Sequence, residues 1–196
     1  MTSDRGQLFV LSAPSGAGKD ALLYHVLRAC PDLKKCVTVT TRQQRQGEVD
    51  GVDYRFVTPQ QFEDLRSADA LLEWAEVFGN FYGTPRQWVL DQLAEGNTVI
   101  LKIDVQGGQA VKSLYPESVL VFVAPPSVEE QERRLRERQT ESEQDLSLRL
   151  SEAAREMAAM PEYDYVVVND DLAHASDLVR CIVRAEGCRV RPPRKG

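Results

Sequence analysis

An apolar run that passes directly into a glycine-rich loop and then into a helix is the feature that most limits the fold of this chain. The run Gln7–Ser12 (QLFVLS) has the continuous hydrophobicity of a strand buried on both faces of a parallel sheet. Residues 13–19 (APSGAGK) follow, and Lys19–Ala29 places apolar side chains at helical spacing. This order predicts an α/β fold in which helices cover a parallel sheet.

The loop has the composition of a phosphate-binding site. Successive backbone N–H groups of such a loop surround one anion, and the N-terminus of the following helix adds partial positive charge. Gly16 and Gly18 allow the backbone angles that the loop needs, and Lys19 can reach the outer phosphates of a nucleotide. The residues that we expect to contact a nucleoside triphosphate are Ala13, Pro14, Ser15, Gly16, Ala17, Gly18, Lys19 and Asp20.

Two residues of this loop depart from the usual pattern G-x-x-x-x-G-K-[ST]. Ala13 takes the first glycine position, which is acceptable if its backbone φ is negative. Asp20 replaces the Ser or Thr whose hydroxyl normally binds Mg²⁺. A carboxylate can bind Mg²⁺ more strongly than a hydroxyl, but it also repels nearby phosphates. Asp20 is the one candidate metal ligand.

Further apolar runs alternate with helical patterns along the chain. Thr98–Asp104, Val119–Val123 and Asp164–Val168 are candidate strands of the same sheet. The alternation of strands and helices favours a parallel sheet with helices on both faces.

Three short stretches have the pattern of a helix start. Thr58 and Thr84 are each followed by Pro and, three residues after the Thr, by Gln. Ser127 is followed by Glu130 in the same way, which is a capping box. We therefore expect helices that begin directly after these three residues.

Two stretches do not fit the simple alternation. Val37–Phe81 is rich in Gly, Thr, Arg and Tyr and is interpreted as a small inserted subdomain. Glu129–Met160 is strongly charged and helical on both sides of residues 139–142, which indicates a helical hairpin able to move over a site. We expect one domain over residues 1–196, with a core of 1–36, 89–126 and 162–196, an inserted subdomain of 37–88 and a lid of 127–161.

Composition narrows the class of partner. The 196 residues have a formal net charge of −6, which argues against general binding to nucleic acid or to an anionic membrane. Eighteen of the 24 cationic residues are Arg, the side chain suited to bidentate phosphate contacts, so a locally basic cleft is compatible with the acidic total.

The cysteines and the first residues of the chain favour a reduced, cytoplasmic protein. Cys30, Cys36, Cys181 and Cys188 lack the density of a secreted disulfide scaffold. A metal site made of these four is a poor alternative, because spacings of six and seven residues fit no zinc signature. The first apolar run is too short for a signal or membrane segment.

Seven motifs in order make the chain resemble the guanylate kinases, from about Gln7 to Asp171. The motifs are APSGAGK, TTRxxRxGEVDGVDYxF, LLEWAEVFGNFYGT, IDVQG, PPS, RLRER-T-SE and YDYVVVNDD. The resemblance implies a three-layer α/β fold of the P-loop NTPase type, with residues 37–88 binding GMP. It also implies Mg²⁺-dependent transfer of the γ-phosphoryl group of ATP to GMP in purine nucleotide metabolism.

By this resemblance the GMP phosphate is bound by Arg42, Arg45, Tyr54 and Tyr82, while guanine is recognised by Thr38, Glu73 and Thr84, with Asp104 also in the GMP site. The residue types agree with these roles. Two Arg and two phenol groups are good hydrogen-bond donors to a phosphate dianion. A carboxylate at Glu73 can accept from N1–H and the N2 amine of guanine, a donor edge that adenine lacks. Alternatives are a solvated basic loop for the Arg pair, packing for the Tyr pair and a surface position for Glu73.

Lys102 stands where this family usually carries an acidic residue, and Asp104 retains the second carboxylate. Residues 102 and 104 share one face of a strand. Our hypothesis is that Asp20 compensates by supplying the charge missing at residue 102 and pairs with Lys102. The alternative is that the two changes are unrelated.

In the lid, the resemblance implies that Arg134, Arg138 and Arg149 turn toward the phosphates, whereas Arg133 and Arg136 pair with nearby Glu residues in solvent. Asn169 lies in the region near the adenine of ATP, or else caps the following helix together with Asp170.

Lys19, Arg42, Arg134, Arg138 and Arg149 are the expected catalytic residues. The partners are ATP and GMP as small-molecule substrates, and the chain is a monomer or a homodimer. Two alternative functions stay open at this point. One is a kinase for another phosphorylated acceptor such as ribose 1,5-bisphosphate, because the string GKDALL resembles those enzymes. The other is a guanylate-kinase-like interaction module without activity.

Overall fold

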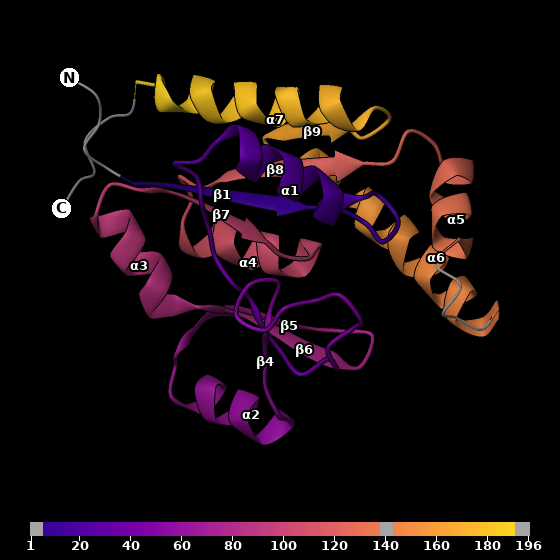
Figure 1. Cartoon of the computed structure of the whole chain (residues 1–196), viewed down its shortest axis with the longest axis horizontal. Helices are drawn as coiled ribbons and strands as arrows, with labels where there is room; N and C mark the ends of the chain where they lie inside the picture. The colour runs from indigo at the N-terminus through magenta and orange to yellow at the C-terminus, as the bar shows by residue number, and fades with distance from the viewer. Residues whose placement is uncertain (1–5, 138–142, 191–196) are drawn as a thin grey trace.

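A parallel sheet of five strands forms the core of the computed structural model, which describes residues 6–137 and 143–190. Its strand order is β2-β7-β1-β8-β9 (Figure 1). The strands are β1 (Gln7–Ser12), β2 (Lys34–Lys35), β7 (Thr98–Lys102), β8 (Val119–Ala124) and β9 (Tyr165–Val168). Strand β1 pairs in parallel with β7 on one side and β8 on the other, so the strand before the glycine-rich loop lies at the centre of the sheet.

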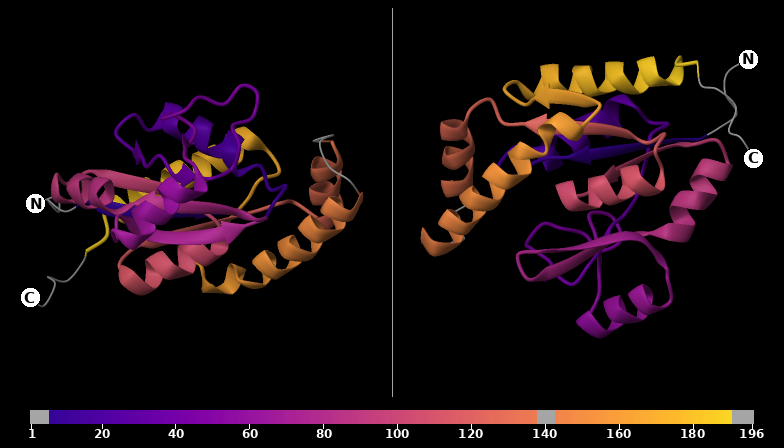
Figure 2. Two further views of the ribbon diagram at one scale, coloured as in Figure 1. Left: turned by 90° about the horizontal axis from the view of Figure 1, so that it is seen from below. Right: turned by 180° about the vertical axis from the view of Figure 1, so that it is seen from behind.

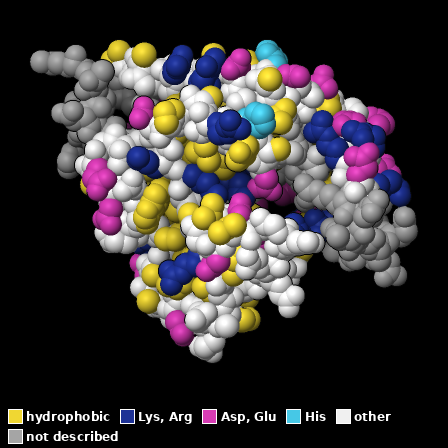
Figure 3. Space-filling view, viewed as in Figure 1, with side chains coloured by type: hydrophobic (Ala, Val, Ile, Leu, Met, Phe, Trp, Pro, Cys, Tyr) yellow, Lys and Arg dark blue, Asp and Glu magenta, His cyan; other side chains and the backbone are white. Residues whose placement is uncertain are grey.

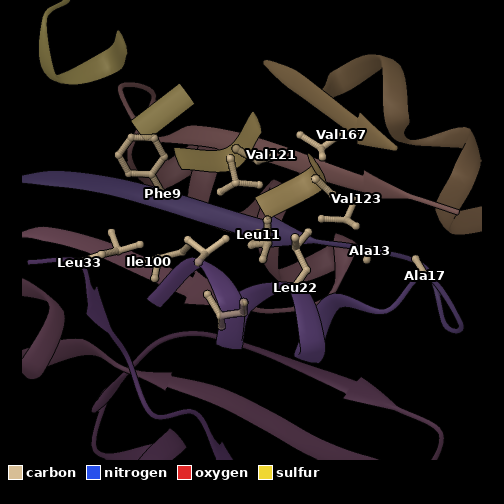
Figure 4. Close-up of a cluster of buried hydrophobic side chains, with 14 of the residues drawn as sticks. Phe9, Leu11, Ala13, Ala17, Leu22, Leu33, Ile100, Val121, Val123 and Val167 are labelled. Carbon is tan, nitrogen blue, oxygen red and sulfur yellow. The ribbon is translucent and has the colours of Figure 1, made fainter. Parts of the chain in front are cut away.

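Helices cover both faces of this sheet, as the alternation of patterns predicts. On one face α1 (Lys19–Ala29) and α7 (Leu172–Gly187) pack on side chains such as Phe9 and Leu11 (Figure 4). On the other face α3 (Arg86–Ala94) and α4 (Val105–Leu114) pack on Leu8 and Val10. Because successive residues of a strand point to opposite faces and both faces are covered, the four consecutive residues 8–11 of β1 can all be apolar.

A second sheet lies beside the core, at the bottom of Figure 1, and carries its own small apolar cluster of Val39, Phe62 and Leu71. Its order is β4-β3-β6-β5, and β6 runs antiparallel to both of its neighbours. The elements are β3 (Val39–Thr40), β4 (Arg55–Phe56), α2 (Pro59–Ser67), β5 (Leu71–Val77) and β6 (Asn80–Pro85). All of them fall within residues 37–88.

Two helices project from one end of the core and are seen again in both views of Figure 2. They are α5 (Val128–Arg136) and α6 (Glu143–Ala158), and a short 3-10 turn, Met160–Glu162, leads from α6 to β9. The C-terminal part of α6 is anchored in the core, where Ala153 is buried and Met157 packs on the α4 face. Arg138, which joins the two helices, lies outside the described residues.

The three predicted helix starts have different outcomes. Thr58 accepts from the N–H of Gln61 in a complete capping box, and Ser127 accepts from the N–H of Glu130. The prediction for Thr84 is wrong, because Thr84 is part of β6 and α3 begins at Arg86 without a side-chain cap. The hydroxyl of Thr84 is used elsewhere, as described below.

Three strand ends also differ from the prediction. Strand β7 ends at Lys102 and not at Asp104, because Asp104 is the N-cap of α4. Strand β8 continues to Ala124, and β9 begins at Tyr165. Asp164 lies outside β9 because its carboxylate accepts from the N–H of Leu120.

All four cysteines are free thiols, and Cys36 is buried. No helix within residues 6–137 and 143–190 is both long and apolar enough to cross a membrane.

The central packing predicts a large difference between two Leu→Ala changes. Leu22 is fully buried between α1 and the sheet, whereas Leu114 at the end of α4 is 56% exposed. We expect Leu22→Ala to lower the free energy of unfolding by about 2–5 kcal/mol, and Leu114→Ala to change it by less than about 0.5 kcal/mol. Urea denaturation of both variants measures this. Equal losses would contradict the assignment of the core.

Candidate active site

The loop after β1 has the backbone conformation of an anion-binding turn. Gly16 and Gly18 have φ values of 87° and 82°, in the left-handed region that favours glycine. Gly18 is the N-cap of α1, and a Cβ at this position would lie 2.5 Å from Nδ2 of Asn169. The φ of Ala13 is not positive, so a residue with a Cβ is acceptable at this position, where the usual pattern has glycine.

Three hydrogen bonds to other parts of the chain hold the loop in place. Asn169, buried after β9, donates from Nδ2 to the carbonyl of Ala17 at 2.7 Å, and Gln131 of α5 donates to the carbonyl of Ser15 at 2.7 Å. Lys19 donates from Nζ to the carbonyl of Ile103 at 2.7 Å, beyond the end of β7. Burial lowers the pKa of Lys19, and the neighbouring Asp20 carboxylate opposes this effect.

A cleft of about 940 Å³ runs from this loop to the second sheet. In Figure 3, Lys and Arg side chains with acidic side chains beside them lie where the second sheet meets the core. Most residues predicted for the site line the cleft: Ala13, Pro14, Ser15, Gly16, Gly18, Lys19, Asp20, Thr38, Arg42, Arg45, Tyr54, Glu73, Tyr82, Asp104 and Arg149. The cleft therefore brings together predicted residues up to 136 positions apart in the sequence, from Ala13 to Arg149.

A cluster of Arg and Tyr side chains forms one wall of the cleft. The guanidinium of Arg42 lies 5.3 Å from the centre of the Tyr54 ring, and the rings of Tyr54 and Tyr82 are 6.0 Å apart. Arg42 also pairs with Glu48 at 2.7 Å, so its orientation is fixed before any ligand binds. Arg45 lies on the same wall. The cluster presents the donors that a phosphate dianion requires.

Glu73 is a buried carboxylate that faces the cleft from β5. Its residue is 7% exposed, and its Oε1 accepts from the Thr84 hydroxyl at 2.5 Å. Burial raises the pKa of Glu73 to about 7, and the hydrogen bond from Thr84 opposes this rise. Thr84 does not line the cleft but orients Glu73, which explains why its hydroxyl does not cap α3.

The first turn of α4 packs closely on Glu73. Asp104 caps this helix by accepting from the N–H of Gly107 at 3.1 Å. A Cβ at Gly107 would lie 2.6 Å from Oε2 of Glu73 and 3.0 Å from Oδ1 of Asp104. Thr38, which is 4% exposed, also lines the cleft. Two carboxylates and a hydroxyl therefore face a narrow space that suits a ligand with N–H donors.

Asp20 and Lys102 form the ion pair that the sequence hypothesis proposes. Nζ of Lys102 lies 2.5 Å from Oδ1 of Asp20, across the boundary between α1 and β7. Among the described residues no cluster of three or more His, Cys, Asp or Glu side chains could hold a metal ion. Mg²⁺ is commonly held by substrate phosphates with only one or two carboxylates, so the 69% exposed Asp20 side chain fits a single ligand to a phosphate-bound ion.

Four predicted residues have other positions. Asn169 donates to the carbonyl of Ala17 and so supports the loop from outside the cleft, and the Thr84 hydroxyl donates to Glu73. Arg134 donates to Glu130 at 2.7 Å and to the carbonyl of Asn169 at 3.2 Å, close to the loop but outside the cleft wall. The alternative that Asn169 or Asp170 caps α7 is wrong, because the cap is Asp171.

The described arginines of α5 all pair with Glu residues. This agrees with the expectation for Arg133, which pairs with Glu130 and Glu137, and for Arg136, which pairs with Glu132. Arg134, expected to turn toward the phosphates, pairs with Glu130 instead. Arg149 of α6 lines the cleft, and its guanidinium lies 4.7 Å from the centre of the Phe78 ring in the turn between β5 and β6.

Sequence reasoning did not identify seven residues of the cleft wall: Gln46, Glu48, Val77, Phe78, Asn80, Ile103 and Glu156. Glu48 lies in the quoted GEVDG motif, which could have indicated it. Glu156 of α6 accepts from the N–H of Ser15 at 3.3 Å, and burial raises its pKa to about 7. Only the packing of α6 on the loop reveals Glu156, because 141 residues separate it from Ser15.

Comparison with known proteins decides the family. The family model described as guanylate kinase matches residues 5–186. The chain belongs to the guanylate kinase family. Members of this family are ATP:GMP phosphotransferases, which are nucleoside monophosphate kinases. Neither of the two alternative functions is favoured by these matches.

Similar guanylate kinases span almost the whole chain. The guanylate kinase of Desulfitobacterium hafniense is 48% identical over 191 residues, covering 97% of this chain and 96% of the relative. That of Myxococcus xanthus is 48% identical over 185 residues, covering 94% and 88%. The crystal structure of guanylate kinase from Anaplasma phagocytophilum aligns with a TM-score of 0.82 at 36% identity, covering 96% of this chain and 89% of that one.

The buried Glu73 predicts a dependence of stability on pH. A carboxyl whose pKa rises from 4.5 to about 7 on folding keeps a proton that the unfolded chain releases, so its contribution is full below about pH 4.5 and is lost as pH rises to about 7. As the pH rises, the ligand-free wild type should lose on the order of 2–3 kcal/mol of its free energy of unfolding through Glu73, and Glu73→Gln should not show this loss. Denaturation at pH 5 and pH 8 measures it.

The control for this prediction is Glu76→Gln, which changes an exposed carboxylate of the same strand. It should keep the wild-type difference between the two pH values. Burial also raises the pKa of Glu156, so Glu73→Gln should keep a smaller dependence of stability on pH. A Glu73→Gln variant whose pH dependence equals that of the wild type would contradict the role given to Glu73.

Proposed function

We propose that this chain transfers the γ-phosphoryl group of Mg²⁺-bound ATP to GMP and releases ADP and GDP. The observation that carries the proposal is that the phosphate loop and the buried Glu73 face one cleft. A kinase needs a donor site and an acceptor site within reach of each other, and guanine is the base whose edge suits a carboxylate.

On the donor side, the backbone N–H groups of the loop bind the ATP phosphates, and Lys19 reaches the outer ones. The proposed contacts come from Ala13, Pro14, Ser15, Gly16, Ala17, Gly18, Lys19 and Asp20, with Asn169 near the adenine. When bound, Mg²⁺ neutralises charge on the β- and γ-phosphates, and Asp20 is its protein ligand. Glu156 occupies the N–H of Ser15 in the ligand-free protein, so ATP has to replace this carboxylate.

On the acceptor side, Glu73 accepts from N1–H and the N2 amine of guanine. Thr84 orients Glu73, while Thr38 and Asp104 complete the base pocket. Arg42, Arg45, Tyr54 and Tyr82 donate to the GMP phosphate. A base without donors at these two positions would leave Glu73 as a buried, unpaired carboxylate, which is costly. The site should therefore reject adenine nucleotides.

The transfer needs little acid–base chemistry because the attacking oxygen already belongs to a phosphate anion. Catalysis is then a matter of position and of charge neutralisation by Lys19, Arg42, Arg134, Arg138 and Arg149. We propose that residues 37–88 are the GMP-binding subdomain and that residues 127–161 are a lid. Closure of the two over the core at 1–36, 89–126 and 162–196 would exclude water and limit ATP hydrolysis.

A panel of acceptors tests the proposal. We expect ADP production from Mg·ATP with GMP and dGMP, and at least about 100-fold lower kcat/KM with AMP, because adenine has no donor at N1 or C2 to match the guanine edge that Glu73 accepts from. Ribose 1,5-bisphosphate should give no turnover. Turnover with ribose 1,5-bisphosphate but not with GMP would replace the proposed function by the alternative kinase. Binding of GMP without any turnover would favour the inactive module.

The Arg cluster gives a second prediction. Arg42→Lys keeps the charge but loses the planar, multiple donors, so we expect kcat/KM for GMP to fall about 10- to 100-fold with little change in KM for ATP. The matched control is Arg55→Lys on β4, which is exposed and lies outside the cleft wall. Initial rates at varied GMP measure both. An equal effect of the two changes would contradict the role of Arg42.

A further inference from the structure

Lys102 is a buried cation at the wall of the cleft, and the reaction described above gives it no role. It is the last residue of β7, and its side chain is only 8% exposed. A buried ammonium is costly unless a negative group faces it. Asp20 faces it at 2.5 Å, so the position is built to keep a positive charge inside the cleft.

The surroundings of Lys102 connect the two halves of the proposed site. On one side lies Asp20, directly after the phosphate-loop residue Lys19. On the other side Nζ lies 4.3 Å from the centre of the Tyr54 ring, which in turn contacts Arg42 and Tyr82. The ammonium of Lys102 therefore lies between the residues that would bind the donor phosphates and those that would bind the acceptor phosphate.

The charges along this line alternate from Lys19 through Asp20 to Lys102. Lys19 is held at the carbonyl of Ile103, so its position does not depend on the Asp20 carboxylate. Burial disfavours the charged form of Lys102, but Asp20 and Tyr54 together oppose this and raise the pKa of Lys102 above its ordinary value. Lys102 is thus positively charged in the ligand-free cleft at neutral pH.

We propose that Lys102 is a further phosphate-binding residue of the reaction, which contacts the GMP phosphate and the phosphoryl group in transfer, and that Asp20 is its counter-ion in the ligand-free cleft. This inference rests on the proposed function. In the reaction an oxygen of the GMP phosphate forms a bond to the γ-phosphorus of ATP. The bond from that phosphorus to the bridging oxygen breaks, and its electron pair leaves with ADP.

Lys102 stays an ammonium throughout and transfers no proton. Its charge neutralises negative charge on the two phosphates as they approach, which is the main barrier to a reaction between two anions. The incoming phosphates then supply the negative partner that Asp20 supplies beforehand. Asp20 is a positioning residue for Lys102, because it acts on the GMP phosphate only through the ammonium.

The test begins with Lys102→Met, which keeps the length of the side chain and removes the charge. Calorimetric titration with GMP, without ATP or metal ion, should show binding at least 30-fold weaker than in the wild type. The kcat with Mg·ATP should fall at least 30-fold. The matched control is Lys34→Met, which removes an exposed charge on β2 outside the cleft wall and should change both values less than threefold.

Variants of Asp20 distinguish a role of Lys102 in phosphate binding from a purely structural role. Asp20→Asn should leave GMP affinity unchanged or improve it, because Lys102 keeps its charge. In Lys102→Met the Asp20 carboxylate faces the phosphates unopposed, so the double variant should regain at least threefold in GMP affinity. If Lys102→Met does not fold, the double variant, which keeps neither the ammonium nor its counter-ion, takes its place in the comparison. Its GMP affinity should be about 10-fold lower than that of Asp20→Asn.

Two results would overturn the inference. One is a folded Lys102→Met variant whose GMP affinity and kcat are both within threefold of wild type. The other is equal loss of GMP affinity in Asp20→Asn, Lys102→Met and the double variant, which describes a structural ion pair. Turnover of GMP by the wild type is measured independently of these variants, so either result would overturn this inference without overturning the proposed function.

Discussion

The pairing of β1 between β7 and β8 is the constraint on which the rest of the structure depends. In a parallel sheet the carboxyl ends of neighbouring strands lie at one edge, and ligands bind there. The phosphate loop leaves β1 at this edge, and Lys19 is held at the carbonyl of Ile103 just beyond β7. Ser12, the last residue of β1, donates to the carbonyl of Asp104 at 3.1 Å. These bonds fix the distance between the loop and the base pocket.

Two carboxyl side chains at this edge, Glu73 and Glu156, are buried or half-buried although their burial does not favour folding. Burial raises the pKa values of Glu73 and Glu156 to about 7, so both carboxylates resist ionisation in the ligand-free protein. In the proposed reaction a ligand would satisfy both groups: guanine donors would face Glu73, and phosphates would replace Glu156 at Ser15. The cost falls on the ligand-free state, which makes binding of the correct nucleotides more selective.

Local patterns were enough to predict the central strand, α1 with its bounds, the helices α5 and α6 and the cap at Thr58. They were enough because hydrophobic period and capping depend on residues close in sequence. Thr84 was misread because its local pattern fits an N-cap equally well, while a buried carboxylate 11 residues away takes its hydroxyl. Glu156 was missed because nothing in its own segment reveals the contact with Ser15. The Asp20–Lys102 pair was predicted only because both departures lie in motifs with a known spacing.

The central claim is that one cleft joins ATP to GMP for direct phosphoryl transfer. Phosphorus NMR of the wild-type protein with Mg·ATP and GMP tests it most directly, because it distinguishes every phosphorus product in one sample. The account predicts that the resonances of ADP and GDP grow in equal amounts while inorganic phosphate stays at background. Formation of ADP with an equal amount of inorganic phosphate and no GDP would contradict it.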